Sequence, residues 1–276
     1  MSTPKRQKST SFLLTNHRRA KIGVHVGGPG GDDVAERLVY GVQAVRSVLK
    51  RCPDRVLEVY ADGELGDRRR ARVPELNAWT APVKTMDRAG LDRLCEGGLH
   101  QGLAARIAAP EPLTEAAAKD RVLGLSAPFL LLLDGVQDPR NFGACLRTAD
   151  GAGVDLVIVS RNRNVGLTPV VSKVAAGAAE VQPVAAVANL ARFMSFLRDS
   201  GVFLVGTDDG AAADLHRADL QGPLGLVLGA EGEGLRRLTQ ERCDLLVRIP
   251  MRGAVESLNV AVAAGVCLFE AVRQRS

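Results

Sequence analysis

The chain has 276 residues, of which 46% are hydrophobic and 24% are charged, so it can form a sizeable packed core and is not a disordered protein. Aromatic residues make up only 4%, which excludes extensive stacking of nucleic-acid bases on Phe, Tyr or Trp. The net charge is +5, and residues 1–35 account for +4 of it, with six Lys and Arg against two Asp. Any RNA-binding surface in the rest of the chain must therefore be a local patch.

Residues 1–35 are predicted to form a flexible basic tail, because they contain the glycine-rich stretch 27–31. A transit peptide is the alternative, but no amphipathic helical period supports it. The five cysteines include no C-x-x-C pair and no histidine lies near them in ligand spacing, so we predict reduced thiols, no bound metal and a cytoplasmic location. No apolar run approaches the ~20 residues that span a bilayer, so no membrane segment is predicted.

Residues 36–109 alternate helical and strand patterns and are predicted to form a small α/β domain. Apolar residues at helical spacing predict a helix near 42–49. Short apolar stretches predict the other elements, which are strands at 56–60, 83–86 and 102–108 and a helix at 91–95. The domain also carries a basic cluster made of Arg68, Arg69, Arg70 and Arg72. A contact with nucleic acid and a solvated helix face are the two interpretations of this cluster.

A linker is predicted at 110–127, because Pro110 and Pro112 interrupt both helix and central strand. A second domain is predicted at 128–276, where near-continuous apolar strands alternate with helical patterns. The strands are expected at 129–133, 154–159, 202–206, 224–229 and 245–249, and the helices near 141–153, 188–199, 233–242 and 257–273. Strands that are apolar on both faces and separated by helices indicate a parallel sheet covered on both sides.

Three segments of the second domain carry polar residues suited to chemistry. The first, 134–150, leaves a buried strand and enters a helix, with Asn141 in the first turn beside unpaired backbone N–H groups. Arg147 lies off the apolar stripe of that helix and can point into a cleft or across an interface. A capping Asn and a solvated Arg are the alternative interpretation of this segment.

The second segment places Gly229, Gly232 and Gly234 after a buried strand, where a ligand can approach the backbone closely. The spacing is not that of a dinucleotide-binding loop, and Glu231 puts a carboxylate where such a loop would hold phosphate. In the third segment a strand ends at 249 and the last helix follows. Ser257 is predicted as its N-cap, and Asn259 is an isolated amide in an apolar run, unless both residues merely cap the helix.

In this order and spacing, at strand ends where open α/β sheets bind ligands, the three segments resemble the motifs of the SpoU (TrmH-like) branch of SPOUT RNA 2'-O-ribose methyltransferases. The resemblance covers 129–276 and, more weakly, 39–109, where the sequences YGVQAV at 40–45 and LHQG at 99–102 carry it. It implies a catalytic set made of Asn141, Arg147, Glu231, Ser257 and Asn259.

The resemblance also implies a fold, a cofactor and an assembly. The second domain would contain a deep trefoil knot, and its first and last helices would form the interface of a homodimer. The cofactor would be S-adenosylmethionine, held bent among the loops that follow three strands. The residues expected to bind it are Gly206, Thr207, Gly229, Gly234, Ile249, Met251 and Leu258.

Within the family, the resemblance is to enzymes that methylate a guanosine of 23S ribosomal RNA. A tRNA 2'-O-ribose methyltransferase is one alternative, and a non-catalytic RNA-binding factor for ribosome assembly is another. A nicotinamide oxidoreductase is disfavoured by the glycine spacing. The first domain would capture RNA through its arginine cluster, with polar contacts from His100 and Gln101.

The same resemblance suggests roles for the catalytic set. The family assigns proton removal to the arginine at 147, but a neutral guanidine is rare because the arginine pKa lies above ~12. We therefore expect Arg147 mainly to grip a substrate phosphate through two parallel hydrogen bonds, with some base character. Glu231 is expected to orient Asn141 or Arg147, and Asn259 to hold the ribose or a loop.

Overall fold

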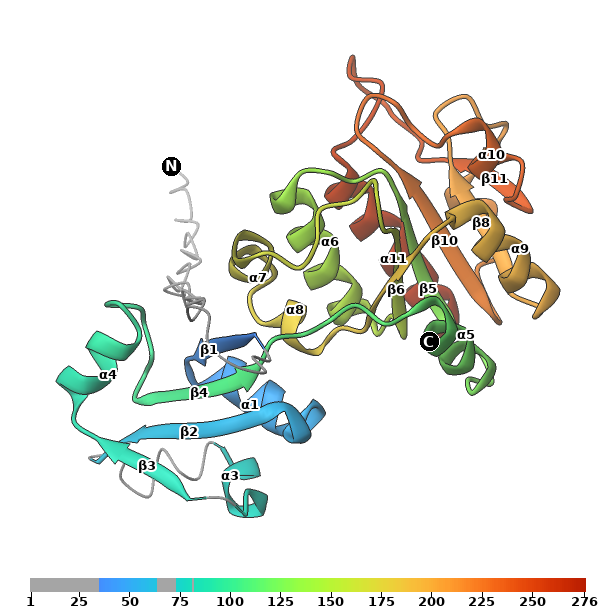
Figure 1. The fold of residues 1–276 in the computed structure, drawn as a ribbon. Helices are drawn as coiled ribbons and strands as arrows, with labels where there is room; N and C mark the ends of the chain where they lie inside the picture. Colours follow the sequence, from blue (N-terminus) through green and yellow to red (C-terminus); the bar gives the residue numbers. More distant parts are fainter. Residues whose placement is uncertain (1–34, 64–72, 81) are drawn as a thin grey trace, which may run out of the picture.

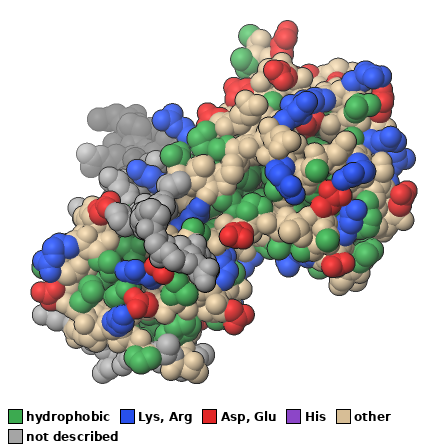
Figure 2. Space-filling model, in the orientation of Figure 1, with side chains coloured by type: hydrophobic (Ala, Val, Ile, Leu, Met, Phe, Trp, Pro, Cys, Tyr) green, Lys and Arg blue, Asp and Glu red, His purple; other side chains and the backbone are tan. Residues whose placement is uncertain are grey.

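The computed structural model describes residues 35–63, 73–80 and 82–276. They form two lobes, one built on a four-stranded sheet and the other on a seven-stranded sheet (Figure 1). The arginine cluster at 68–72 and residues 1–34 of the predicted tail lie outside the described residues. On the face drawn in Figure 2, Lys and Arg side chains are mixed with Asp and Glu over the larger lobe, as the small net charge of that part of the chain predicts.

The smaller lobe is a mixed sheet in the order β1-β4-β2-β3, in which β4 runs antiparallel to both neighbours and β2 pairs with β3 in parallel. Its elements are β1 (Glu36–Tyr40), α1 (Val42–Arg51), η1 (Pro53–Arg55), β2 (Val56–Asp62), α3 (Glu75–Ala78), β3 (Val83–Met86), α4 (Arg88–Leu94) and β4 (Leu103–Ala108). The sequence pattern did not predict β1, because the buried Arg37 interrupts its apolar run.

The turn at 99–102 shows why two expected RNA contacts have structural roles. His100 is buried; its Nδ1 accepts a hydrogen bond from the Gly102 backbone N–H (3.0 Å), and its Nε2 lies 2.9 Å from an Asp92 carboxylate oxygen. The expectation of an RNA contact through His100 is therefore wrong. Gln101 is exposed, and its side-chain oxygen accepts a bond from the Val42 N–H at the start of α1 (3.1 Å).

The larger lobe confirms the predicted parallel sheet, with all neighbouring strands parallel in the order β7-β6-β5-β10-β8-β11-β9. The strands are β5 (Phe129–Asp134), β6 (Leu156–Ser160), β7 (Val184–Val187), β8 (Phe203–Thr207), β9 (Ala213–Asp214), β10 (Leu224–Gly229) and β11 (Leu245–Arg248). The short strands β7 and β9 were not predicted. They lie at the two edges of the sheet and are only four and two residues long, which is too short for a clear pattern.

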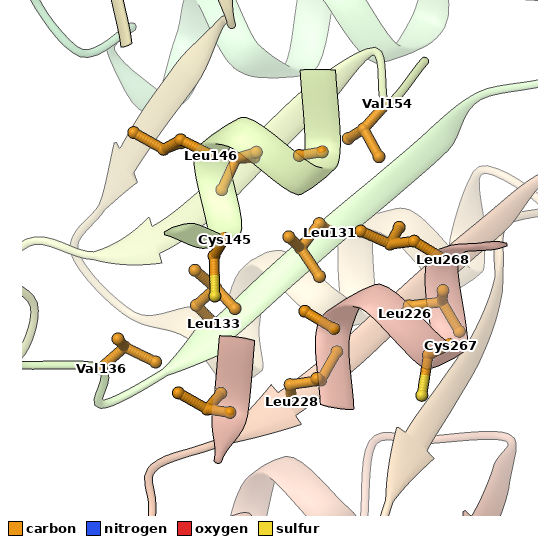
Figure 3. Packing of buried hydrophobic residues seen from close by; sticks show 14 of the residues in the cluster. Leu131, Leu133, Val136, Cys145, Leu146, Val154, Leu226, Leu228, Cys267 and Leu268 are labelled. Carbon is orange, nitrogen blue, oxygen red and sulfur yellow. The ribbon is translucent and has the colours of Figure 1, made fainter. Parts of the chain in front are cut away.

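Helices cover both faces of this sheet (Figure 1). Along β5, Leu131 and Leu133 face α6 (Pro139–Ala152) and α11 (Val260–Arg275), as Figure 3 shows, and Leu130 and Leu132 face α9 (Leu190–Asp199). The remaining helices are α5 (Glu115–Leu123), α7 (Pro169–Ala175), α8 (Ala178–Val181), η2 (Leu215–Arg217) and α10 (Arg237–Gln240). Burial on alternate faces explains why the strand reads as a continuous apolar run.

The stretch 110–127 contains a helix that the sequence pattern did not predict. Thr114 caps α5 by accepting a hydrogen bond from the Ala117 N–H (3.2 Å), and Ala118 and Val122 are buried against the larger sheet. Leu113 pairs with β7 through two backbone hydrogen bonds of 2.7 and 3.2 Å. Residues 113–123 therefore pack on the larger lobe.

A buried polar contact joins the lobes. Arg37 of β1 donates to the Ser172 hydroxyl in α7 (2.7 Å) and lies 3.5 Å from the carboxylate of Glu180 in α8. Arg55 donates to the backbone oxygen of Glu180 (2.7 Å), and Val181 packs in the core of the smaller lobe. Burial raises the pKa of Glu180 despite the neighbouring guanidinium.

Within the described ranges, none of the helices has the length and apolar character needed to cross a membrane. The same residues contain no group of His, Cys, Asp and Glu that could hold a metal ion. The five cysteines are unpaired, and burial raises the pKa of Cys95, Cys145, Cys243 and Cys267 to about 12, which makes these thiols unreactive at neutral pH.

Candidate active site

Three amino acids from the three predicted segments meet at the carboxyl edge of the larger sheet. The Asn259 side-chain amide donates to Asn141 Oδ1 (3.0 Å) and to Glu231 Oε2 (3.0 Å). The Asn141 amide donates to the same Glu231 oxygen at 3.4 Å. These side chains come from the first turn of α6, the loop after β10 and the residue before α11, so the packing of the sheet brings together positions 28 to 118 residues apart.

The Asn259 side chain both caps α11 and holds the cluster together, whereas Ser257 does not form the N-cap predicted for it. Helix α11 begins at Val260, and Asn259 Oδ1 caps it by accepting a hydrogen bond from the Ala261 N–H (3.0 Å). Ser257 is exposed and lies before the cap, so the expectation that Ser257 is the N-cap is wrong. The isolated amide at 259 supplies the cap with its oxygen and uses its nitrogen for the cluster.

Asn141 does not cap α6. The N-cap is Asp138, whose carboxylate accepts a hydrogen bond from the Arg140 N–H (2.6 Å), and Pro139 occupies the first helical position. The Asn141 side chain is therefore available to the site, and the capping interpretation of this residue is wrong.

Arg147 lies on the same helix as Asn141, but the structure does not bring it into the cluster. Its side chain is exposed and makes no hydrogen bond or ion pair with any described residue. None of the cavities described below includes it. Among the described residues, none uses a donor of this guanidinium, which is open to a partner from outside.

A cavity of about 410 Å³ adjoins the cluster at the carboxyl ends of β8, β10 and β11. This volume is in the range of sites for small molecules and cofactors. Glu231 and Ser257 line it, together with six of the seven residues expected to bind the cofactor, which are Thr207, Gly229, Gly234, Ile249, Met251 and Leu258. Gly206 does not line it, because a Cβ at this position would point into the core, 2.7 Å from the Cys243 sulfur.

Carboxylates dominate the electrostatics of this cavity. Its lining includes Asp208, Asp209, Glu231, Glu233 and Glu256, and among the described residues no Lys or Arg lines it. Such a lining favours a ligand with positive charge. A sulfonium ion beside an amino group, as in S-adenosylmethionine, fits this lining. Apart from Glu231, sequence reasoning missed these acids; the pair at 208–209 directly after a buried strand was the available signal.

Gly229 is required because the backbone of the following loop packs directly against it. A Cβ at Gly229 would lie 2.0 Å from the backbone carbon of Gly234, so the loop folds back directly onto the end of β10. Gly232 and Gly234 have φ angles of +80° and +63°, which favour glycine. The glycines thus close the loop that carries Glu231 and form one wall of the cavity.

A buried carboxylate that sequence reasoning missed holds the far end of this loop. Asp134, at the end of β5, is 3% exposed and accepts bonds from the Arg236 N–H (3.2 Å), the Arg236 Nη1 (3.1 Å) and the Thr239 hydroxyl (2.7 Å). Its signal in the sequence was a lone acid ending an apolar strand. The loop with Glu231 is therefore fixed at both ends.

Fold and site together define an α/β enzyme that binds a cationic cofactor at the carboxyl edge of a parallel sheet. Residues 128–269 match the model of the SpoU rRNA Methylase family, and residues 38–113 match the RNA 2'-O ribose methyltransferase substrate binding model. The chain belongs to the SpoU rRNA methylase family.

Relatives resemble the chain over nearly its whole length. The 23S rRNA (guanosine-2'-O-)-methyltransferase RlmB of Shewanella oneidensis is 48% identical, covering 86% of this chain and 97% of its own. RlmB of Pectobacterium atrosepticum is 50% identical, covering 86% and 98%. Among solved structures, the SpoU methyltransferase AviRb from Streptomyces viridochromogenes in complex with AdoMet matches with a TM-score of 0.66 and 28% identity, covering 87% of this chain and 90% of its own.

Proposed function

We propose that this protein transfers the methyl group of S-adenosylmethionine to the 2'-hydroxyl of a guanosine in 23S ribosomal RNA. The observation that carries the proposal is the Asn141–Glu231–Asn259 cluster at the rim of an acidic cavity of cofactor size. The relatives that are 47–50% identical to this chain match it over 97–98% of their own length. Their name, 23S rRNA (guanosine-2'-O-)-methyltransferase, supports this substrate. The reaction would take place in the cytoplasm, where ribosomes are assembled.

S-adenosylmethionine, when bound, supplies an electrophilic methyl group. Thr207, Gly229, Ile249 and Leu258 line the cavity and would hold it, largely through backbone groups. The acidic lining favours the positively charged donor over its product, which has lost the sulfonium charge, so the same carboxylates promote product release.

The hydrogen bonds within the cluster separate the roles of its members. Asn259 uses its oxygen for the helix cap and its amide for two acceptors, so it is a positioning residue. Asn141 retains one N–H, and Glu231 retains the oxygen Oε1, which has no partner among the described residues. These two groups would bind the ribose hydroxyls and align the 2'-oxygen with the methyl group.

Arg147 would grip a phosphate of the substrate. Its guanidinium has no partner in the part of the chain that the structure describes, and a bidentate contact with phosphate uses its planar fork. Such a contact would fix the distance between the target ribose and the donor.

A homodimer would bring Arg147 to a second subunit. Val262 and Phe269 on α11 are 52% and 50% exposed, although large apolar side chains are usually covered. A Cβ at Gly151 of α6 would lie 3.9 Å from the Phe269 ring, so α6 and α11 share one surface (Figure 1). We place the twofold interface on this surface, and we expect α11 to complete the family's trefoil knot.

Sedimentation equilibrium tests the dimer. Phe269→Glu should shift the full-length protein to monomer, while Leu123→Glu, on an exposed apolar residue of α5, should not. If Phe269→Glu forms a dimer with the dissociation constant of the wild-type protein, the interface lies elsewhere.

We assign RNA capture to residues 36–109, linked through 110–127 to a catalytic domain at 128–276. Mapping ribose methylation in 23S rRNA from cells with and without the protein tests the function. Loss of one methylated guanosine, restored by the wild-type protein but not by Glu231→Ala, is the expected result. Loss of a tRNA methyl group instead would favour the tRNA alternative, and an unchanged pattern would favour a non-catalytic assembly factor.

A further inference from the structure

A second cavity opens at the same edge of the sheet, on the side of α9 and α10. Its volume is about 470 Å³, and its wall includes Asp134, Ser160, Arg163, Arg236 and Arg237. Three arginines against one carboxylate give these charged residues a net charge of +2. We call this cavity the arginine cleft; its charge is opposite in sign to that of the acidic cofactor cavity.

The three guanidinium groups differ in how firmly they are held. Arg236 is fixed by the buried Asp134 through its backbone N–H and Nη1. Arg237 pairs with Glu241 of the next turn (2.9 Å) and with no other described residue, and both side chains are well exposed. Arg163 is exposed, and its side chain has no partner among the described residues. Each of the three retains N–H donors for a ligand.

Ser160 adds a hydroxyl group to the arginine cleft. It is the last residue of β6, it is only 8% exposed, and it lines the cleft. Its hydroxyl makes no hydrogen bond within the described part of the chain. The Ser160 oxygen stays accessible within the cleft, so it can bond to a polar ligand atom above β6.

Arg236 links the arginine cleft to the active site. A third cavity, of about 270 Å³, is lined by Asn141 and Glu231 of the cluster and also by Arg236. Arg236 therefore borders both this third cavity and the arginine cleft. A strand whose ribose lies against Asn141 and Glu231 has a short route past Arg236 into the cleft.

We propose that the arginine cleft binds a backbone phosphate of the substrate RNA, next to the nucleotide that is methylated. The inference rests on the proposed function for the identity of the RNA. Guanidinium groups match the geometry of phosphate oxygens, and the Ser160 hydroxyl can donate to the same group. With few aromatic residues for stacking, such contacts on the catalytic lobe hold the strand in register over the cofactor.

The test is the double variant Arg163→Gln/Arg237→Gln, which removes two charges without touching the buried Asp134–Arg236 pair. Arg217→Gln is the control. Arg217 is exposed and lies in η2 against the far end of α11, where Gln274 bonds to Ala218, and it has no ion pair among the described residues. That end lies about 24 Å from Asn259 along the 16-residue helix.

The measurements are S-adenosylmethionine binding by calorimetry and affinity for an unmodified 23S rRNA transcript at several salt concentrations. The double variant should bind S-adenosylmethionine normally but bind the transcript about tenfold more weakly at low salt. The slope of log affinity against log salt should fall by about 1. Equal affinity and slope in the double variant and Arg217→Gln would overturn the proposal.

Methyl transfer to the transcript distinguishes a failure of the proposed function from a failure of the arginine-cleft assignment. If the wild-type protein binds the transcript but transfers no methyl group to it, the proposed function falls, and the affinity comparison still tests the cleft. Inorganic phosphate distinguishes the source of the ligand. One result would overturn the assignment to RNA: inorganic phosphate protects the wild type from thermal unfolding, and the double variant and Arg217→Gln have the same RNA affinity. That combination would indicate a site for free phosphate.

Discussion

Removing the Glu231 carboxylate is the most direct test of the cluster. In Glu231→Ala the amides of Asn141 and Asn259 lose their shared acceptor, although their own hydrogen bond of 3.0 Å can remain. Glu231 is exposed, so the free energy of unfolding should change by less than about 1 kcal/mol. Loss of alignment between ribose and donor should slow methyl transfer about 100-fold, equivalent to about 2.7 kcal/mol.

The assay is single-turnover methyl transfer to the 23S rRNA transcript at saturating donor, with donor affinity measured separately by calorimetry. Glu233→Ala is the matched control: it removes an acid from the same loop and the same cavity, and Glu233 makes no hydrogen bond with a described residue. Both variants should bind the donor somewhat more weakly. If Glu231→Ala is no slower than Glu233→Ala at saturating donor, the carboxylate acts through cavity charge alone and the positioning role is refuted.

Four further outcomes are expected. Asn259→Ser should keep the cap of α11, and with it the unfolding midpoint, but lose most turnover, whereas Asn259→Ala should also lose about 1 kcal/mol of stability in denaturant titrations. Gly229→Val should destabilise the protein by about 3 kcal/mol and abolish donor binding in calorimetry, because its Cβ meets the Gly234 backbone. Arg147→Lys should weaken RNA binding as well as turnover in filter-binding and methylation assays; normal affinity without turnover would favour a base role. Several hydrogen bonds, those from Arg273 first, lower the pKa of Glu270 from 4.5 to about 2. The ionised Glu270 therefore stabilises the fold fully above pH 4.5, and this stabilisation is lost as the pH falls toward 2. An acid titration of Glu270→Gln should lack this part of the loss in stability.

Much of the larger lobe was predictable because its strands carry their own signal. A strand such as β5, buried on both faces by α6 and α9, is apolar at every position before its last residue, Asp134, and that run is visible without knowledge of its neighbours. The apolar run of the edge strand β7 covers only four residues, and the edge strand β9 and the helix α5 lack such a run. Their burial depends on partners distant in sequence, as when Leu113 pairs with β7, so local patterns could not reveal them.

The polar positions of the site were visible for a related reason. An amide at 259 and a carboxylate at 231 are unexpected beside apolar strands and helices, and their order along the chain identified the family resemblance. Sequence reasoning could not foresee the acidic lining of the cavity, because Asp209 and Glu256 come from separate loops that only the sheet order brings together.

The sequence by itself therefore determined the class of fold and the residue types of the site, since both follow from local hydrophobicity and from polar residues at strand ends. Only the tertiary structure decided what those residues do. It turned Gly206 toward the core, made Asn259 rather than Ser257 the cap of α11, and buried His100 in a turn. Packing and hydrogen bonding decide such roles, and both depend on the positions that the backbone takes in space, which the order of residue types alone does not give.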